Sequence, residues 1–132
     1  MRIVSGIQPT NLLHIGNYLG AIQQWIPLQA KNECVFFIAD LHALTTPYDP
    51  QKLRDSITQT VIAYVAAGIN PEKSIIFVQS QIKEHTELCW LLNTLCPIGE
   101  LQRMTQYKDK SEKFKTNINA GLLDYPVLMA AD

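Results

Sequence analysis

The hydrophobic pattern of the chain predicts strands that alternate with helices. Short apolar runs, rich in β-branched and aromatic residues, indicate strands buried on both faces. One such strand ends with Ile3 and Val4 and breaks at Ser5-Gly6, and two more are expected at Cys34–Ala39 and Ser74–Gln79. Between the strands, apolar residues recur at helical spacing. They are Leu19, Ile22, Trp25 and Ile26 in a first helix, and Leu53, Ile57, Val61, Tyr64 and Val65 in a second.

Local signals set the ends of these two helices. The first should fade near Lys31-Asn32. The second begins at Asp49-Pro50, an acidic N-cap followed by proline at the first position, and Gly68 terminates it. Three strands joined by two long helices predict two right-handed βαβ crossovers. The expected fold class is therefore α/β, with a parallel sheet and flanking helices.

The second half of the chain is predicted to form two helices followed by a polar loop. We expect helices at Glu84–Leu95 and Glu100–Lys108, interrupted by Pro97-Ile-Gly99. The polar segment Lys108–Asn119 contains four lysines and is predicted to be a mobile loop. The lysines are Lys108, Lys110, Lys113 and Lys115.

The end of the chain is predicted to start a short helix. A turn at Asp124-Tyr125 precedes Pro126, which can open a helix over Val127–Asp132. No cap or breaker closes that helix, so we expect the sequence to continue in a longer protein.

Composition narrows the class of protein. The chain has 132 residues, enough for a single domain, and its 47% hydrophobic and 17% charged content excludes broad disorder. A net charge of −1 offers nucleic acid little non-specific attraction. Cys34, Cys89 and Cys96 form no C-x-x-C pair, so neither a disulfide framework nor a zinc site is indicated. Cys89 and Cys96 lie seven apart, on one helical face, and are expected to be core thiols. No signal peptide or membrane-length run is recognisable, and the cytoplasm is the expected compartment, with no membrane partner.

Candidate chemistry gathers between Ser5 and Ala21. Gly6 is expected to let the backbone turn with φ > 0 and pass close to a ligand, and polar side chains follow at the carboxyl end of the strand. His14-Ile-Gly-Asn17 then leads into the first helix, where unpaired N–H groups favour an anion. The glycines do not spell the dinucleotide fingerprint, and no phosphate loop occurs. The segment still indicates a nucleotide site, because ligands of α/β sheets bind at this end of the strands.

The sequence from Ser5 to Ala21 closely resembles one protein family. GIQPT followed by LHIGNYLGA is similar to tryptophanyl-tRNA synthetases, and HIGN resembles the HIGH signature of class I synthetases. ADLHALT, GELQRMTQYKDKS and DYPVLMAAD extend the resemblance over the whole chain. It implies a Rossmann-like fold of the HUP type, with residues 1–132 forming the N-terminal portion of the catalytic domain. The second signature of that family, the KMSKS loop, and the anticodon-binding domain do not occur in these residues.

The implied reaction is ATP-dependent activation of L-tryptophan to tryptophanyl-adenylate, followed by transfer to tRNA(Trp), with Mg²⁺ on the phosphates. The resemblance implies that Gln8, Pro9 and Thr10 form the ATP-facing turn and that His14 holds the phosphates. It implies that adenine packs on Gly16 and that Lys110 swings onto the phosphates. For Asn17, a role at the ATP and an ordinary helix cap both stay open.

The resemblance also implies a tryptophan pocket on the last helix. Tyr125, Met129 and Asp132 lie four and three apart, on one helical face. Met129 would pack on the indole, Asp132 would accept its N–H, and Tyr125 would reach the ammonium group. Periodicity alone predicts only an amphipathic helix with an exposed aspartate. The resemblance implies that Gly6, Gln8 and His42 complete this pocket. For His42, a place in the pocket and the role of a packed or capping histidine both stay open, whereas His85 is expected to be solvated.

Two other functions stay open. A tyrosyl-tRNA synthetase shares the fold and the first motif, although it would need polar groups for a phenol. A non-catalytic nucleotide-binding module is the second, since the second signature is missing. The apolar faces of Leu88–Leu92 and Ile98–Met104 exceed what the predicted elements cover, so self-association as a homodimer is also expected.

Overall fold

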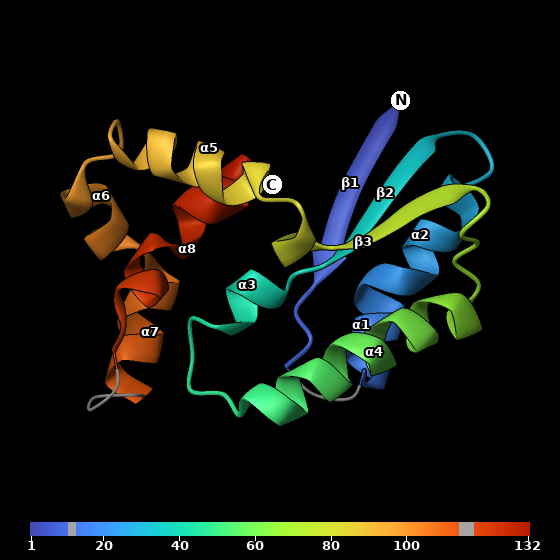
Figure 1. Ribbon diagram of the computed structural model, residues 1–132, viewed down its shortest axis with the longest axis horizontal. Coiled ribbons are helices and arrows are strands. Elements are labelled where there is room, and N and C mark those ends of the chain that lie inside the picture. Colours follow the sequence, from blue (N-terminus) through green and yellow to red (C-terminus); the bar gives the residue numbers. More distant parts are fainter. Residues whose placement is uncertain (11–12, 114–117) are drawn as a thin grey trace. The chain divides into compact units, whose positions relative to one another are not determined.

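A three-stranded parallel sheet lies at the centre of the first half of the chain (Figure 1). The computed structural model describes residues 1–10, 13–113 and 118–132. The strands are β1 (Arg2–Ile7), β2 (Glu33–Ile38) and β3 (Ser74–Val78), in the spatial order β1-β2-β3. Both pairings are parallel, with Gly6 opposite Phe37 and Phe37 opposite Phe77. The predicted α/β class and parallel sheet are confirmed.

The helices between the strands cover one face of the sheet. The first helical run consists of α1 (Ile15–Asn17), the π-helical turn η1 (Tyr18–Ile22) and α2 (Gln23–Leu28), and the second is α4 (Pro50–Ala67). Trp25 of α2 stacks on Phe36 of β2, with ring centroids 4.6 Å apart, and meets the edge of Tyr64 of α4. Alternate residues of a strand share one face. The face of β2 that carries Phe36 therefore holds the core of this part. The core residues are Ile22, Trp25, Cys34, Phe36, Ile38, Tyr64 and Ile69.

The predicted caps of α4 are present. The Asp49 carboxylate accepts hydrogen bonds from the N–H groups of Gln51 and Lys52, at 2.9 and 3.2 Å. Gly68 ends the helix with φ of 111°, in the left-handed region that glycine tolerates best. Val65, expected on the buried face, is 47% exposed, so the apolar face of α4 is narrower than predicted.

Two strand predictions need correction. β1 does not break at Ser5-Gly6 but continues to Ile7, and Gly6 has no positive φ. Its backbone is extended because it pairs with β2 in register. β3 is an edge strand of the sheet, and Ile75 on it is 55% exposed, so this strand is not buried on both faces.

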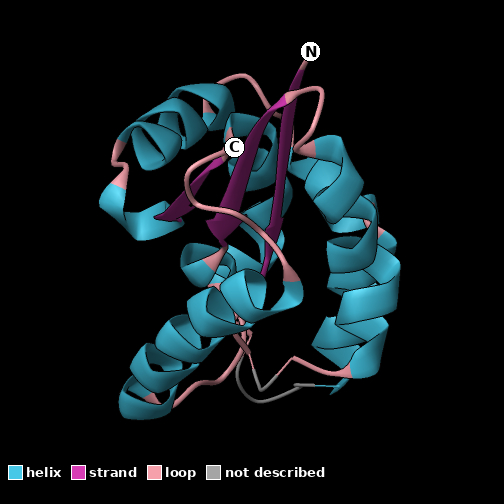
Figure 2. Ribbon diagram, turned by 90° about the vertical axis from the view of Figure 1, so that its right-hand side faces the viewer, coloured by secondary structure: helices cyan, strands magenta, loops and turns pink. Residues whose placement is uncertain are grey.

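The chain divides into two compact units. The sheet unit comprises Met1–Ala43 and Asp49–Gln81, and it includes the short helices α3 (Asp40–Ala43) and η2 (Gln79–Gln81). The helical unit comprises Leu44–Tyr48 and Ile82–Asp132. Figure 2 separates the strands of the sheet unit, in magenta, from the helices, in cyan. No helix of the described residues is both long and apolar enough to span a bilayer.

The helical unit contains four helices in its described residues. They are α5 (Glu84–Asn93), α6 (Ile98–Arg103), α7 (Thr105–Lys113) and α8 (Ala120–Ala131). Cys89, Leu101 and Val127 form its small core, in which α5 packs on α8. The buried Cys89 confirms the prediction of a core thiol, and Cys96 is partly buried against the same cluster.

Two expectations for this unit are wrong. Residues 108–113 belong to helix α7 rather than to a loop; Lys115 and the rest of 114–117 lie outside the described residues. Helix α8 starts at Ala120, because the Asn119 side chain caps it by accepting the Leu122 N–H at 3.0 Å. Asp124-Tyr125 is therefore helical, and Pro126 lies inside the helix instead of opening it.

Candidate functional site

The first candidate site is the start of α1, where His14 and Asn17 cap each other's backbone. The Nδ1 atom of His14 accepts the Gly16 N–H at 3.1 Å, and Asn17 Oδ1 accepts the His14 N–H at 3.1 Å. This reciprocal arrangement is a capping box. The capping interpretation of Asn17 is thus confirmed, and its role at ATP stays a prediction.

The capping box also fixes which nitrogen of His14 can donate. Because Nδ1 accepts a hydrogen bond, the neutral ring carries its proton on Nε2. The Gly16 N–H donates to the His14 ring, and the Asn17 N–H donates to the His14 carbonyl at 2.9 Å. The expectation of unpaired backbone donors is therefore wrong at these two positions. The Nε2–H of the exposed His14 imidazole remains available to a phosphate.

Gly16 is required by the same box. A Cβ atom at this position would lie 2.8 Å from Cε1 and 2.9 Å from Nδ1 of His14. Any side chain would push the imidazole away from the Gly16 N–H. The glycine thus holds the ring in place, whether or not adenine also packs there.

The turn after β1 exposes two of its three predicted residues. Gln8 and Thr10 are exposed, whereas Pro9 is fully buried and stiffens the turn. Gly6, one residue before the end of β1, is constrained by the space for a side chain rather than by a positive φ. A Cβ there would lie 2.8 Å from the Phe37 carbonyl oxygen and 2.9 Å from the Phe37 ring. The close approach predicted for Gly6 exists, but toward the neighbouring strand.

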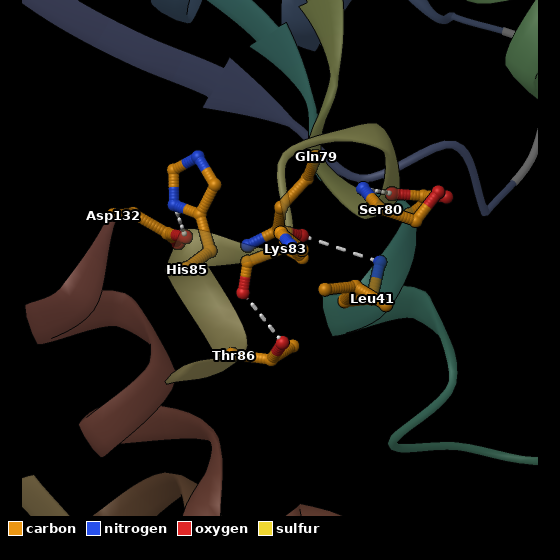
Figure 3. Close-up of polar contacts among 8 residues, drawn as sticks. Leu41, Gln79, Ser80, Lys83, His85, Thr86 and Asp132 are labelled. Carbon is orange, nitrogen blue, oxygen red and sulfur yellow. Dashed lines mark hydrogen bonds and ion pairs between the residues drawn. The ribbon is translucent and has the colours of Figure 1, made fainter. Parts of the chain in front are cut away.

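The carboxyl ends of β2 and β3 are tied to each other by a reciprocal clasp (Figure 3). Asp40 Oδ1 accepts the Ser80 N–H at 2.9 Å, and Gln79 Oε1 accepts the Leu41 N–H at 3.2 Å. Gln79 is completely buried. The clasp holds α3, whose His42 is 6% exposed. His42 is therefore packed within the sheet unit, as the less specific interpretation of a lone histidine predicts.

In the helical unit, Asp132 faces a partner that the sequence did not suggest. His85 Nδ1 lies 3.0 Å from Asp132 Oδ1, and the two side chains are only 10% and 8% exposed (Figure 3). The contact is an ion pair by distance and lacks the alignment of a hydrogen bond. The expectation of a solvated His85 is wrong, because this side chain turns toward the end of α8.

His85 belongs to a polar stripe along α5. His85, Cys89 and Asn93 are spaced by four, so they share one face of the helix. Asn93 Nδ2 donates to Asp124 Oδ2 at 2.9 Å, and the Cys89 thiol lies 3.8 Å from the same oxygen. Burial, with help from the Asp124 and Asp132 carboxylates, raises the pKa of Cys89. We call His85, Cys89, Asn93, Asp124 and Asp132 the α5–α8 seam.

The other residues predicted for the tryptophan pocket differ in exposure. Met129 is 60% exposed and Tyr125 is half-buried, and burial raises the Tyr125 pKa. Lys110 of α7 places its ammonium 5.6 Å from the centre of the Tyr125 ring, a cation–π distance. Its predicted swing to the phosphates is not observed and stays a prediction.

The comparisons identify the family. Residues 1–132 match the family described as tRNA synthetases class I (W and Y). The chain belongs to this family. The tryptophan–tRNA ligase of Rickettsia conorii is 53% identical over 130 residues, 98% of this chain and 39% of that protein. The ligase of Prochlorococcus marinus is 52% identical over 131 residues, 99% of this chain and 39% of that protein. The chain thus spans about two fifths of the length of these relatives.

Solved structures agree with the class I synthetase fold. Tryptophanyl-tRNA synthetase from Campylobacter jejuni is 45% identical with a TM-score of 0.89, covering 100% of this chain and 41% of that one. A second structure of it, complexed with ADP and tryptophan, has a TM-score of 0.90 over the same shares. Tyrosyl-tRNA synthetase from Archaeoglobus fulgidus reaches 0.79 at 18% identity, covering 98% and 41%, which supports the fold alone. The predicted Rossmann-like class I fold is confirmed.

The predicted site residues of this synthetase chain divide between its two units. The structure joins His14, Gly16 and Asn17 by hydrogen bonds in the sheet unit, and Lys110 to Tyr125 in the helical unit. Gly6, Gln8, Pro9, Thr10 and His42 also belong to the sheet unit, and Met129 and Asp132 to the helical unit. His85 is the residue that sequence reasoning missed. The signal was available, since His85 shares a helical face with Cys89, which was expected in the core.

Proposed function

We propose that this chain forms the tryptophan pocket and part of the ATP site of a tryptophan–tRNA ligase, as the N-terminal portion of its catalytic domain. The observation that carries the proposal is the 50–53% identity to proteins named tryptophan–tRNA ligase over nearly the whole chain. The reaction would join L-tryptophan to the α-phosphate of ATP, releasing pyrophosphate, and then transfer the aminoacyl group to tRNA(Trp).

At the ATP, the proposed work of the protein is positioning and charge stabilisation. No protein nucleophile is needed, because the tryptophan carboxylate itself attacks the α-phosphorus in line. His14 would donate from Nε2 to a phosphate oxygen, as its tautomer allows. Gln8, Pro9, Thr10, Gly16 and Asn17 would shape the nucleotide site, and Lys110 would leave the Tyr125 ring to neutralise the phosphates.

Mg²⁺ is proposed to arrive with the nucleotide. In the described part of the chain, no three histidine, cysteine or acidic side chains gather as a metal-binding group. Mg²⁺ commonly keeps several waters and binds substrate phosphates with few protein ligands. The ion would neutralise charge on the leaving pyrophosphate.

At the amino acid, the proposed determinant is Asp132. An indole offers a single hydrogen-bond donor, its ring N–H, and an ionised aspartate accepts. Met129 would form an adaptable apolar wall, and Tyr125 would reach the ammonium group. Gly6, Gln8 and His42 would complete the pocket.

Self-association is proposed from the apolar surface of the helical unit. Trp90, Leu91, Leu95 and Ile98 are between 62% and 78% exposed. Exposed apolar side chains of this size in one unit are typical of an interface. We propose a homodimer through this surface, and a protein that stays monomeric at high concentration by analytical ultracentrifugation would contradict it. Since the reaction serves translation, we propose that it takes place in the cytoplasm.

The test is calorimetric binding combined with tryptophan-dependent pyrophosphate exchange. We expect the chain to prefer tryptophan to tyrosine by at least about tenfold. Residues 1–132 by themselves should form adenylate at less than about 1 s⁻¹, the low end for enzymes, since the second signature does not occur among them. Asp132→Ala should remove the preference, while Asp109→Ala, at an exposed position on α7, should keep it.

Each contrary result would point elsewhere. Preferential binding of tyrosine would identify a tyrosyl-tRNA synthetase. ATP binding that does not depend on any amino acid would favour a nucleotide-binding module. Exchange at ordinary enzymatic rates would show that these residues suffice for the chemistry.

A further inference from the structure

The α5–α8 seam holds two carboxylates, Asp124, which is partly buried, and Asp132, whose side chain solvent hardly reaches. Asp132 is 8% exposed, and it follows the last turn of α8, where its N–H donates to the Leu128 carbonyl at 3.1 Å. A buried carboxylate needs a donor or an opposite charge from another element.

Helix α5 supplies that partner from its first turn. His85 is the second residue of α5, and its Nδ1 lies 3.0 Å from Asp132 Oδ1. The amino end of a helix is its positive end, so the position also suits an anion. The same face of α5 holds the second carboxylate, since Asn93 donates to Asp124 at 2.9 Å. Both acidic groups of α8 are thus fixed by polar residues of one α5 stripe.

We propose that His85 is a positioning residue for amino-acid recognition: it fixes the Asp132 carboxylate so that this group accepts the indole N–H of L-tryptophan. The inference rests on the proposed function. The His85 contact uses Oδ1, and a carboxylate has two oxygens with about four lone-pair sites, so a second donor can be accepted. A carboxylate that could rotate would lose geometry for the indole, because hydrogen bonds weaken steeply with angle.

The tautomer of His85 gives a first test that needs no ligand. Contact with Asp132 requires a proton on Nδ1, the opposite of His14, whose Nδ1 accepts a hydrogen bond. Long-range ¹H–¹⁵N NMR of the wild-type chain should show Nδ1–H for His85 and Nε2–H alone for His14. An unprotonated Nδ1 at His85 overturns the proposal.

The second test compares L-tryptophan with β-(3-benzothienyl)-L-alanine, which has a similar shape but no ring N–H. We expect the wild-type chain to bind tryptophan about 10- to 100-fold tighter, as expected when a buried acceptor loses its donor. His85→Leu should reduce this ratio to about threefold or less. His85→Asn, whose amide nitrogen lies near the Nδ1 position, should keep it within about threefold of the wild type.

Two further variants keep the result interpretable. His85→Gln stays polar but moves its amide away from the Nδ1 position, so it should lose the ratio like His85→Leu. Glu84→Gln removes an exposed charge next to His85 and should leave the ratio unchanged. If the His85 variants weaken both ligands equally, His85 is merely structural and the proposal fails. If the wild-type chain does not prefer tryptophan to the analogue, the proposed function fails with it.

Discussion

The clasp at the ends of β2 and β3, in which Gln79 accepts the Leu41 N–H and Asp40 accepts the Ser80 N–H, is the polar contact whose removal we expect to cost the sheet unit most. Gln79→Met keeps the length of the side chain and its burial but removes Oε1, the acceptor of the Leu41 N–H. The Leu41 donor loses its 3.2 Å partner at the point where β2 passes into α3. The Ser80 N–H keeps its bond to Asp40.

The magnitude follows from this geometry. A neutral hydrogen bond contributes about 1 kcal/mol, and a donor left unsatisfied costs about 1–3 kcal/mol. Burial of the more apolar methionine side chain recovers part of this loss. We therefore expect the free energy of unfolding to fall by about 2 kcal/mol. At a urea dependence of about 1.5 kcal/mol per molar, the midpoint should drop by about 1.3 M.

The chain offers a reporter for the sheet unit alone. Trp25 is 6% exposed and stacked on Phe36, whereas Trp90 of the helical unit is 72% exposed. In a Trp90→Phe background, the fluorescence change on adding urea therefore reports the sheet unit. Gln81→Met, in the same short helix but exposed, is the matched control.

A small difference in the free energy of unfolding between Gln79→Met and its control would refute the reasoning. If Gln79→Met and Gln81→Met unfold within about 0.5 kcal/mol of each other, the usual spread of surface substitutions, the clasp does not stabilise the unit. Amide exchange adds a local check. Exchange at Leu41 should accelerate in Gln79→Met more than exchange at Ser80, because Asp40 still holds the second amide.

Two other substitutions test the site and the core. Gly16→Ala should displace the His14 imidazole, so that ¹⁵N NMR detects some Nδ1–H tautomer of the released ring; a ring that stays Nε2–H alone would contradict the capping-box argument. Stability should change little, because the lost cap and the better helix propensity of alanine are each worth about 1 kcal/mol. Burial raises the pKa of Tyr64 above its usual value of 10.0. The unfolded chain then releases this proton first, so stability should fall above about pH 10 by up to about 1.4 kcal/mol per pH unit. In Tyr64→Phe this decline should be clearly smaller in urea titrations between pH 8 and 11, and an identical decline would show that other groups with a raised pKa, such as Cys89 and Tyr125, cause it.

Local sequence determined the sheet unit well. Each strand of the sheet is a short apolar run, and the start and end of α4 follow from Asp49, Pro50 and Gly68. These features depend on neighbours along the chain: the period of apolar residues, a cap that reaches two or three positions ahead, and a glycine that accepts positive φ. The resemblance carried by GIQPT and LHIGNYLGA gave the family in the same way, from contiguous residues.

Where two local signals competed, the sequence was ambiguous. Pro126 favours the start of a helix, yet the Asn119 cap lies further upstream and α8 passes through the proline. The lysines of α7 looked like a loop, although lysine, glutamine and glutamate also favour helices. Which signal wins depends on packing, since most helical stability in proteins comes from tertiary contacts.

Only the tertiary structure decided the surroundings of the polar side chains. By its neighbours in the sequence Gly6 is a turn glycine, but in the structure the Phe37 ring lies where its Cβ would be. His85 looked solvated between acidic neighbours, but it lies against Asp132, far along the chain. Whether a charge is exposed or buried against a partner depends on which segments meet, and the cost of removing it from water makes that pairing specific.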